Sequence, residues 1–169
     1  MRKIAFYLSL LALISHQSCI SFGGGDDDIA NHSNFEPVIM KRSNFETTTL
    51  VENAPRVIEN SGKIYVKDNF IFINEVNKGF HLINNSDPSN PENIAFIKVL
   101  GSSDLSIKED VFYANNATDL IAFKINETTE TLLITKRIKN TFPQIMSPEG
   151  EISYNLEQDE IIIDWQPVN

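Results

Sequence analysis

The residue whose type and position carry the clearest chemistry is Cys19, the single cysteine of the chain. It follows Ser18, and a small residue before a cysteine is the arrangement that a lipoprotein signal peptidase requires at its cut site. We therefore expect a lipid on Cys19, the alternative being a buried or free thiol just past an ordinary cleavage site. With one cysteine, the chain cannot form an internal disulfide even in an oxidising compartment.

The residues before Cys19 have the layout of a secretory signal. The positive charges of Arg2 and Lys3 precede the apolar run Ile4–Ile14. A helix that crosses a bilayer needs about 20 predominantly apolar residues, and this run is well short of that length. Residues 1–18 are therefore predicted to be a signal peptide, and the predicted membrane contact is made through the N-terminal lipid.

The three histidines do not form a metal-ligand pattern. His16 falls in the leader, His32 follows the anchor and His81 stands alone on a predicted strand, whereas zinc ligands recur at short local spacing. We interpret His81 as a solvated strand residue rather than a ligand. No metal and no cofactor is predicted.

The acidic residues give no distinct catalytic motif. Asp104, Asp119 and Asp164 would supply a glycosidase-type carboxylate pair only if folding brought two of them together. Because the chain has 23 acidic residues, such candidates are better explained by chance than by a catalytic role. No nucleophile elbow, phosphate-binding glycine loop or His-Glu-x-x-His motif occurs, so no catalytic residue is assigned. Trp165 is interpreted as a core residue that closes the last hairpin, with a ligand-stacking platform as the alternative.

Charge and composition limit the partners and the size of the fold. Residues 19–169 hold all 23 acidic residues and 12 of the 14 basic ones, a formal charge of −11. Nucleic acid is not an expected partner, because phosphate binding needs a basic surface. Residues 19–30, with three consecutive glycines and three consecutive aspartates, are predicted to be an extended tether. The remainder is enough for one small domain.

Two successive units of short strands dominate the chain from residue 62 to residue 169. Turn residues punctuate β-branched and aromatic runs, which predicts antiparallel strands at 63–66, 70–74, 80–84 and 94–100. Residues 104–115 then align with 63–74 at a shift of 41, and 119–125 align with 79–85 at a shift of 40. Repeats of about 40 residues with four strands each are typical of propeller blades. The prediction is an all-β fold of tandem four-stranded antiparallel units, at about 63–101 and 104–140.

The segments that flank the repeats carry three further expectations. Residues 151–165 are predicted to form a partial third hairpin, and a short helix is expected around 44–52. Residues 31–61 are predicted to pack on the sheet as an N-terminal extension, with Phe35–Met40 as the apolar piece that covers an exposed face. The expected buried residues of the repeats are Ile64, Val66, Phe72, Ile83, Ile97, Ile107, Tyr113, Ile121 and Phe123.

The first repeat resembles the repeat of LVIVP-type proteins. The similarity lies in Ile71–Asn74, Lys78–Ile83 and the Ser-Asp-Pro-x-x-Pro loop at 86–91. It implies β-propeller blades, and it brings no catalytic residues, because the family has none established. The second repeat lacks the glycine and the Asp-Pro loop, and about two and a half repeats are fewer than the four blades of a closed propeller.

The leader and tether resemble those of Bacteroidetes lipoproteins. Relaxed Gln-Ser-Cys cleavage sites are common in those proteins, and an acidic cluster after their lipidated cysteine directs them to the outer face of the outer membrane. The resemblance implies an outer-membrane lipoprotein on the periplasmic or cell-surface side. Asp26–Asp28 lies a few positions later than that acidic signal, so the membrane face is left open.

Three functions compete at the level of sequence. The leading one is a non-catalytic binding or interaction module with an unknown protein or glycan partner, because propeller-type sheets present loops to ligands. The second is a hydrolase that acts on an envelope or extracellular polymer. The third is a remnant of a longer propeller protein, shortened or truncated.

The lipidation of Cys19 is directly testable. Replacement Cys19→Ala removes the only thiol that can form the thioether, so the product should be soluble or uncleaved and carry no lipid. Metabolic labelling with a fatty-acid analogue measures this, with the unaltered chain as control. Undiminished label on the variant would contradict the assignment.

Overall fold

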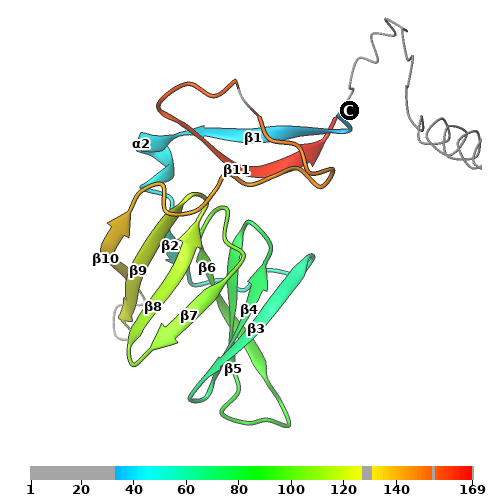
Figure 1. Cartoon of the computed structure of the whole chain (residues 1–169). Helices are drawn as coiled ribbons and strands as arrows, with labels where there is room; N and C mark the ends of the chain where they lie inside the picture. Colours follow the sequence, from blue (N-terminus) through cyan, green and yellow to red (C-terminus); the bar gives the residue numbers. More distant parts are fainter. Residues whose placement is uncertain (1–32, 127–130, 154, 169) are drawn as a thin grey trace, which may run out of the picture. The chain divides into compact units, whose positions relative to one another are not determined.

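The computed structural model of the chain describes residues 33–126, 131–153 and 155–168 (Figure 1). These residues belong to one compact unit, Ser33–Asn169. The predicted signal peptide, the tether and Cys19 lie outside the described residues. Within the described ranges, no helix has the length and apolar character needed to cross a membrane.

The first repeat folds as a five-stranded sheet. The spatial order of its antiparallel strands is β2-β6-β5-β4-β3. The strands are β2 (Leu50–Glu52), β3 (Ser61–Lys67), β4 (Phe70–Glu75), β5 (Gly79–Asn84) and β6 (Glu92–Lys98). Strands β3 to β6 are the four predicted strands, and β2 adds a fifth beside β6.

The second repeat folds as a four-stranded antiparallel sheet with the order β10-β9-β8-β7. Its strands are β7 (Leu105–Lys108), β8 (Val111–Asn116), β9 (Asp119–Asn126) and β10 (Thr131–Ile138). The turns repeat as the strands do: Asp68 and Glu109, 41 positions apart, have φ of 53° and 57°, and Asn77 and Ala117, 40 apart, have 60° and 49°. The predicted all-β fold of tandem antiparallel units is confirmed.

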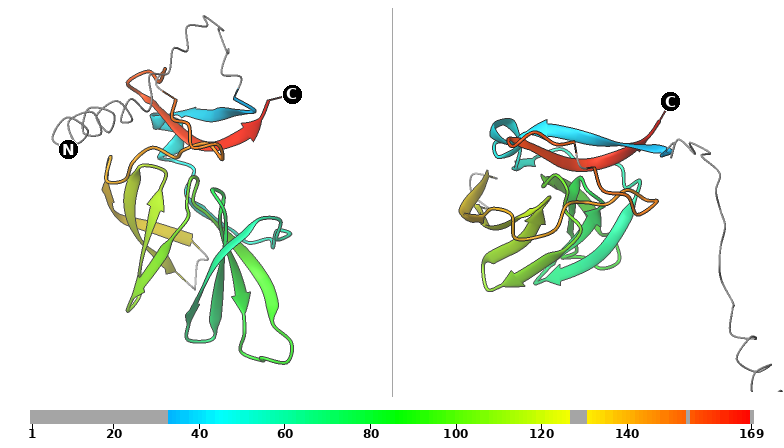
Figure 2. Two further views of the ribbon diagram at one scale, coloured as in Figure 1. Left: turned by 45° about the vertical axis from the view of Figure 1, so that its right-hand side comes forward. Right: turned by 45° about the horizontal axis from the view of Figure 1, so that its top comes forward.

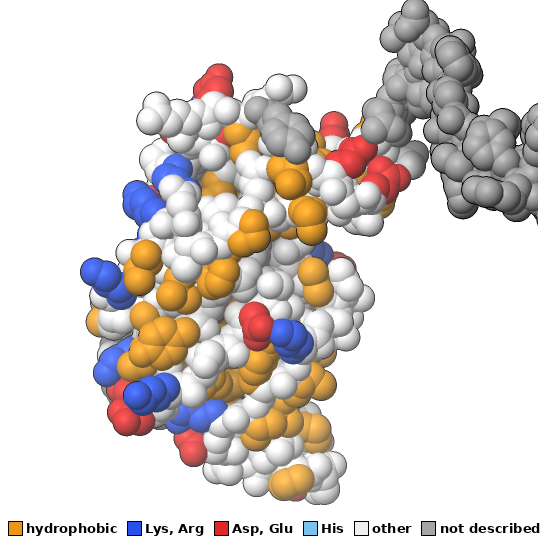
Figure 3. All heavy atoms as spheres, viewed as in Figure 1, with side chains coloured by type: hydrophobic (Ala, Val, Ile, Leu, Met, Phe, Trp, Pro, Cys, Tyr) orange, Lys and Arg blue, Asp and Glu red, His pale blue; other side chains and the backbone are white. Residues whose placement is uncertain are grey.

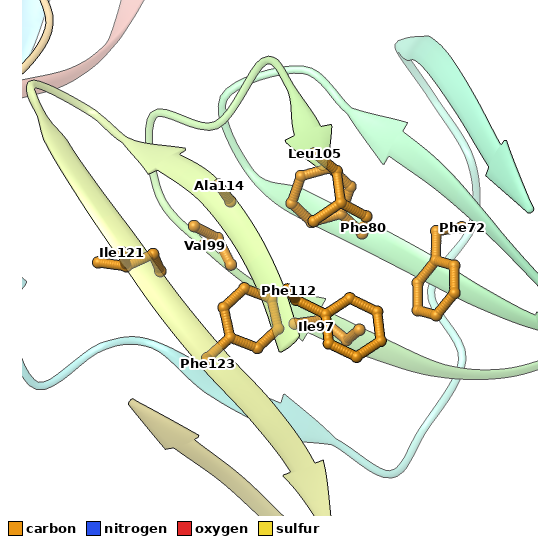
Figure 4. Close-up of a cluster of buried hydrophobic side chains, with 9 residues drawn as sticks. All are labelled: Phe72, Phe80, Ile97, Val99, Leu105, Phe112, Ala114, Ile121 and Phe123. Carbon is orange, nitrogen blue, oxygen red and sulfur yellow. The ribbon is translucent and has the colours of Figure 1, made fainter. Parts of the chain in front are cut away.

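The two sheets pack against each other through one face each, which we call the inner faces. Phe72 and Phe80 of the five-stranded sheet meet Leu105, Phe112 and Phe123 of the four-stranded sheet in one buried apolar cluster (Figure 4). The ring centroid of Phe112 lies 5.3 Å from that of Phe72 and 5.3 Å from that of Phe123. Burial of each such side chain contributes about 1.5–3 kcal/mol, so this interface holds the repeats together.

A separate two-stranded sheet lies across one end of the stacked sheets (Figure 2). It pairs β1 (Phe35–Lys41) with β11 (Glu160–Pro167) in antiparallel register. Its side chains share a second apolar cluster with Phe45, which belongs to the one-turn helix α2 (Arg42–Phe45), and with Ala117 from the turn between β8 and β9.

This two-stranded sheet corrects the prediction of a third hairpin. The described residues of 151–156 form no strand, and Glu160–Trp165 pairs with β1 instead. The segment Phe35–Met40 is therefore a strand partner of β11 and does not cover a sheet face. The hydrophobic pattern predicted a strand at 160–165 but not at Phe35–Met40, and it gave no pairing between them, because it carries no information about which distant segment offers the better partner.

The helix expected around 44–52 is also wrong. The chain is helical only over Arg42–Phe45, and Leu50–Glu52 is the edge strand β2, paired with β6. Four residues give a single turn, which tertiary contacts must stabilise because helix nucleation is unfavourable. Phe45, fully buried, supplies that contact.

Of the nine residues that were predicted to be buried, five are buried, two are partly exposed and two are exposed. Phe72, Ile83, Ile97, Ile121 and Phe123 are buried, whereas Ile107 and Tyr113 are partly exposed. Ile64 and Val66 are 63% and 68% exposed. They lie on β3, an edge strand, and point away from the four-stranded sheet. The alternating pattern predicted a buried face here, but no described part of the chain packs over these two side chains.

Candidate functional site

A cavity of about 600 Å³ opens on the outer face of the four-stranded sheet. Ser106, Tyr113 and Leu120 line it from strands β7, β8 and β9, and the segment 142–145 forms its opposite wall. These three residues alternate with Leu105, Phe112 and Ile121 of the inner face, which places them on the outer one. The volume falls within the range of about 300–1,000 Å³ that is usual for small-ligand sites.

Hydrogen bonds hold one wall of the cavity in place. Asn115 accepts backbone hydrogen bonds from Ser103 and Asp104 at its Oδ1, both at 2.9 Å, and donates from Nδ2 to the carbonyl of Gly101 at 2.8 Å. One amide side chain thus fixes the connection between β6 and β7. The cavity is preformed along this edge.

The same connection requires glycine at position 101. Gly101 has φ +69°, and an added Cβ would lie 2.7 Å from the Cα of Ala117. Both the left-handed backbone and the close approach exclude larger residues. The connection between β6 and β7 is in this way packed directly against the turn between β8 and β9.

Trp165 holds the opposite wall. Its indole Nε1 donates to the carbonyl of Ile145 at 2.9 Å, and the side chain is only partly buried. The interpretation of Trp165 as a core residue that closes the last hairpin is therefore wrong: the side chain is partly exposed and anchors the segment 142–145. Phe142, which is 39% exposed, also lines the cavity.

The three aspartates that sequence reasoning singled out are each held by different partners. Asp104 accepts hydrogen bonds from Lys63 and Tyr65. Asp164 accepts one from the Nδ2 of Asn77 at 2.8 Å. Asp119 is fully buried elsewhere, and no interaction joins two of the three, so the structure forms no carboxylate pair from them.

Asp119 is the polar joint between the N-terminal segment and the four-stranded sheet. It accepts hydrogen bonds from Arg42 of α2 and Arg137 of β10, each at 2.9 Å, and from the backbone N–H of Asn140 at 3.1 Å. Burial disfavours the carboxylate, but these three donors outweigh burial and keep the pKa of Asp119 below its usual value. We therefore assign the buried carboxylate of Asp119 to holding these segments together and not to binding a ligand.

His81 is buried, which corrects its interpretation as a solvated residue. Its side chain is 0% exposed, its Nε2 lies 3.0 Å from Oε2 of Glu75, and its ring packs edge-on against Phe96 with centroids 5.0 Å apart. Nδ1 of His81 is buried with no hydrogen-bond partner. The sequence did contain a sign that His81 is buried: an acidic residue, Glu75, ends the apolar strand that precedes the strand of the histidine.

Glu75 fastens a segment of chain, residues 53–60, over part of the outer face of the five-stranded sheet; we call this segment the strap. The carboxylate accepts the backbone N–H groups of Asn60 at 2.7 Å and Glu59 at 3.1 Å. Arg56 of the strap places its guanidinium 4.3 Å from the ring centroid of Phe96. Burial disfavours the charge of Glu75, yet the hydrogen bonds from His81 and the strap outweigh it and lower its pKa.

The surface that lines the cavity is mostly apolar. Asp104 is the one acidic residue among the described residues that line it. In the part of the chain that the structure describes, no three His, Cys, Asp or Glu side chains cluster so as to hold a metal. No family model, curated protein or solved structure matches this chain.

The pinning of the strap by Glu75 predicts an acid-sensitive contribution to stability. A carboxylate with a lowered pKa stabilises the fold at pH values above its unfolded pKa of about 4.3, and the contribution is lost as the pH falls through the lower pKa of the folded state. Glu75→Gln should therefore cost about 1–3 kcal/mol of unfolding free energy at neutral pH.

Urea unfolding at a series of pH values measures this loss. The difference between the unaltered chain and Glu75→Gln should shrink on acidification, while Glu92→Gln, at an exposed position of β6, should change little at any pH. A Glu75→Gln penalty that stays constant down to low pH would show that the carboxylate charge does not hold the strap.

Proposed function

We propose that this chain is a lipid-anchored envelope protein whose folded unit is a non-catalytic interaction module. The cavity on the four-stranded sheet is its binding site, and the group it binds is an apolar segment of a partner. The observation that carries the proposal is the preformed apolar cavity bounded by Ser106, Tyr113, Leu120 and the segment 142–145.

Two features of the cavity favour binding over catalysis. Asn115, one of its polar lining residues, is engaged in holding the wall, so the hydrogen-bonding groups of this side chain serve the fold. A retaining glycosidase needs two carboxyl groups about 5–5.5 Å apart, and no second acid accompanies Asp104 among the lining residues that the structure describes. An interaction module is therefore better supported than the hydrolase alternative.

The anchor and the family are part of the same proposal. Lipidation of Cys19 would hold the folded unit at the outer membrane, on its periplasmic or surface side, through the tether 19–30. Two antiparallel units 40 to 41 residues apart support a relationship with LVIVP-type repeats. A tethered module presents its cavity to partners in the envelope without needing enzymatic activity.

The cavity can be tested with a neutral apolar dye, N-phenyl-1-naphthylamine, whose fluorescence rises on leaving water. The chain carrying Cys19→Ala, at high dilution, should bind it saturably at one site. Ser106→Glu places a charge in the cavity from an exposed strand position and should weaken binding by about tenfold or more. The matched control Ser86→Glu lies in the exposed loop between β5 and β6 and should bind like the parent.

The result that would overturn the proposed site is equal dye binding by the Ser106→Glu and Ser86→Glu chains. Circular dichroism of both variants, which should match the parent, separates loss of the site from loss of the fold.

A further inference from the structure

The outer face of the five-stranded sheet, which is exposed at β3, repeats the positions that hold the two sheets together. At the shifts of 41 and 40 residues, six positions on β3, β4 and β5 correspond to six on β7, β8 and β9. In the four-stranded sheet these positions form the inner face and pack on the first sheet: Leu105, Ile107, Phe112, Ala114, Ile121 and Phe123. Their counterparts in the five-stranded sheet are Ile64, Val66, Ile71, Ile73, His81 and Ile83.

The strap covers only part of this face. It reaches Glu75, and through Arg56 it reaches Phe96, which lies on β6. On β3, Ile64 and Val66 stay 63% and 68% exposed, although Leu105, the counterpart of Ile64, is 5% exposed. Hydrophobic side chains are visible over the four-stranded sheet and over the edge of the five-stranded sheet in Figure 3. An apolar strip thus remains where the repeat pattern places a sheet–sheet contact.

The cavity stands at the complementary place on the other sheet. Within the chain, Leu105 packs into the cluster that contains Phe72 and Phe80 (Figure 4). Its backbone N–H donates to the hydroxyl of Tyr65 at 3.1 Å. Tyr65, Phe72 and Phe80 correspond by the same shifts to residues on the outer face of the four-stranded sheet. Those counterparts are Ser106, Tyr113 and Leu120, the residues that line the cavity.

The cavity is therefore the unfilled counterpart of the place that Leu105 occupies. Serine in place of tyrosine and leucine in place of phenylalanine leave more room on the outer face of the four-stranded sheet than its counterpart has. The side chain that the repeat geometry brings to this place, from a neighbouring sheet, is that of Ile64. Ile64 is exposed in this chain. It lies on the outer face of the five-stranded sheet, whereas the cavity lies on the outer face of the four-stranded sheet, so Ile64 cannot enter the cavity of the same copy.

We propose that the partner of this module is a second copy of the same chain, with Ile64 of each copy seated in the cavity of the other. This rests on the proposed function and names its partner. The contact is head-to-tail, and two such contacts close two copies into a ring of four sheets, the smallest number usual for a propeller.

Charges around the strip are compatible with contact between two copies of an acidic chain. Lys63 is paired with Asp104, and Lys67 with Asp68, so the ends of the exposed part of β3 carry no excess of either sign. Like-charge repulsion between two copies is therefore not concentrated at the strip, so burial of its apolar side chains can drive the association.

Sedimentation equilibrium of the Cys19→Ala chain over a concentration series tests the assembly. The parent should show a monomer–dimer equilibrium with no larger species. Ile64→Lys and Ser106→Glu, each at an exposed position, should separately raise the dimer dissociation constant by about tenfold or more, because each buries an unpaired charge. Val168→Lys, at a site 53% exposed outside both faces, should leave dimerisation unchanged.

Mixing the two weakened chains distinguishes a head-to-tail contact from a symmetric one. An Ile64→Lys chain and a Ser106→Glu chain retain one intact contact between them and bring opposite charges together in the other, so the mixture should dimerise where neither chain does alone. A symmetric contact between two Ile64 strips would predict no such rescue and would overturn the proposal. A monomeric parent at all concentrations, or growth beyond the dimer, would overturn it as well.

Dye binding keeps this test separate from that of the proposed function. Ile64→Lys leaves the cavity intact, so that chain should bind N-phenyl-1-naphthylamine as the dilute parent does. A parent that binds the dye in a Ser106-dependent way but stays monomeric would refute only the second-copy partner. Absence of dye binding by Ile64→Lys and by the dilute parent would refute the binding site itself.

Discussion

The packing of two sheets through one face each is the constraint on which this structure depends. A sheet made of β-branched and aromatic residues has two faces, and stacking two sheets leaves one face of each without a neighbour. The cluster around Phe72, Phe112 and Phe123 satisfies the inner faces. Every other feature of the fold concerns the outer faces and the open ends of the stack.

The chain deals with its two outer faces in different ways. On the five-stranded sheet, the strap closes over part of the face and is held by the buried pair of Glu75 and His81. On the four-stranded sheet, Ser106 and Leu120 stand at the positions of Tyr65 and Phe80 in the first repeat, and the segment 142–145 leaves a cavity. The pair β1 and β11 closes one end, with Asp119 tying α2 to the four-stranded sheet. The proposed binding function thus originates in incomplete coverage of a repeat.

The elements set by local sequence were predictable, and those set by long-range choice were not. The turns at Asp68 and Glu109 and the strands beside them follow from turn residues and β-branched runs, which act over a few positions. The pairing of β1 with β11 joins strands more than 100 residues apart, and no local pattern specifies it. The burial of His81 could not be predicted because it depends on the strap, which is not adjacent to it in sequence. The exposure of Ile64 could not be predicted either, because an alternating pattern shows that a strand has an apolar face but not whether another sheet covers that face.

The stacking of the sheets is tested most directly by a double-mutant cycle across their inner faces. Phe72→Leu and Phe112→Leu, alone and together, are compared in the free energy of urea unfolding, because the two rings lie 5.3 Å apart on different sheets. The predicted coupling is about 0.5–1.5 kcal/mol, the range of aromatic pairs in contact. Strictly additive effects of the two substitutions would show that the sheets do not pack through these faces, and would contradict the account.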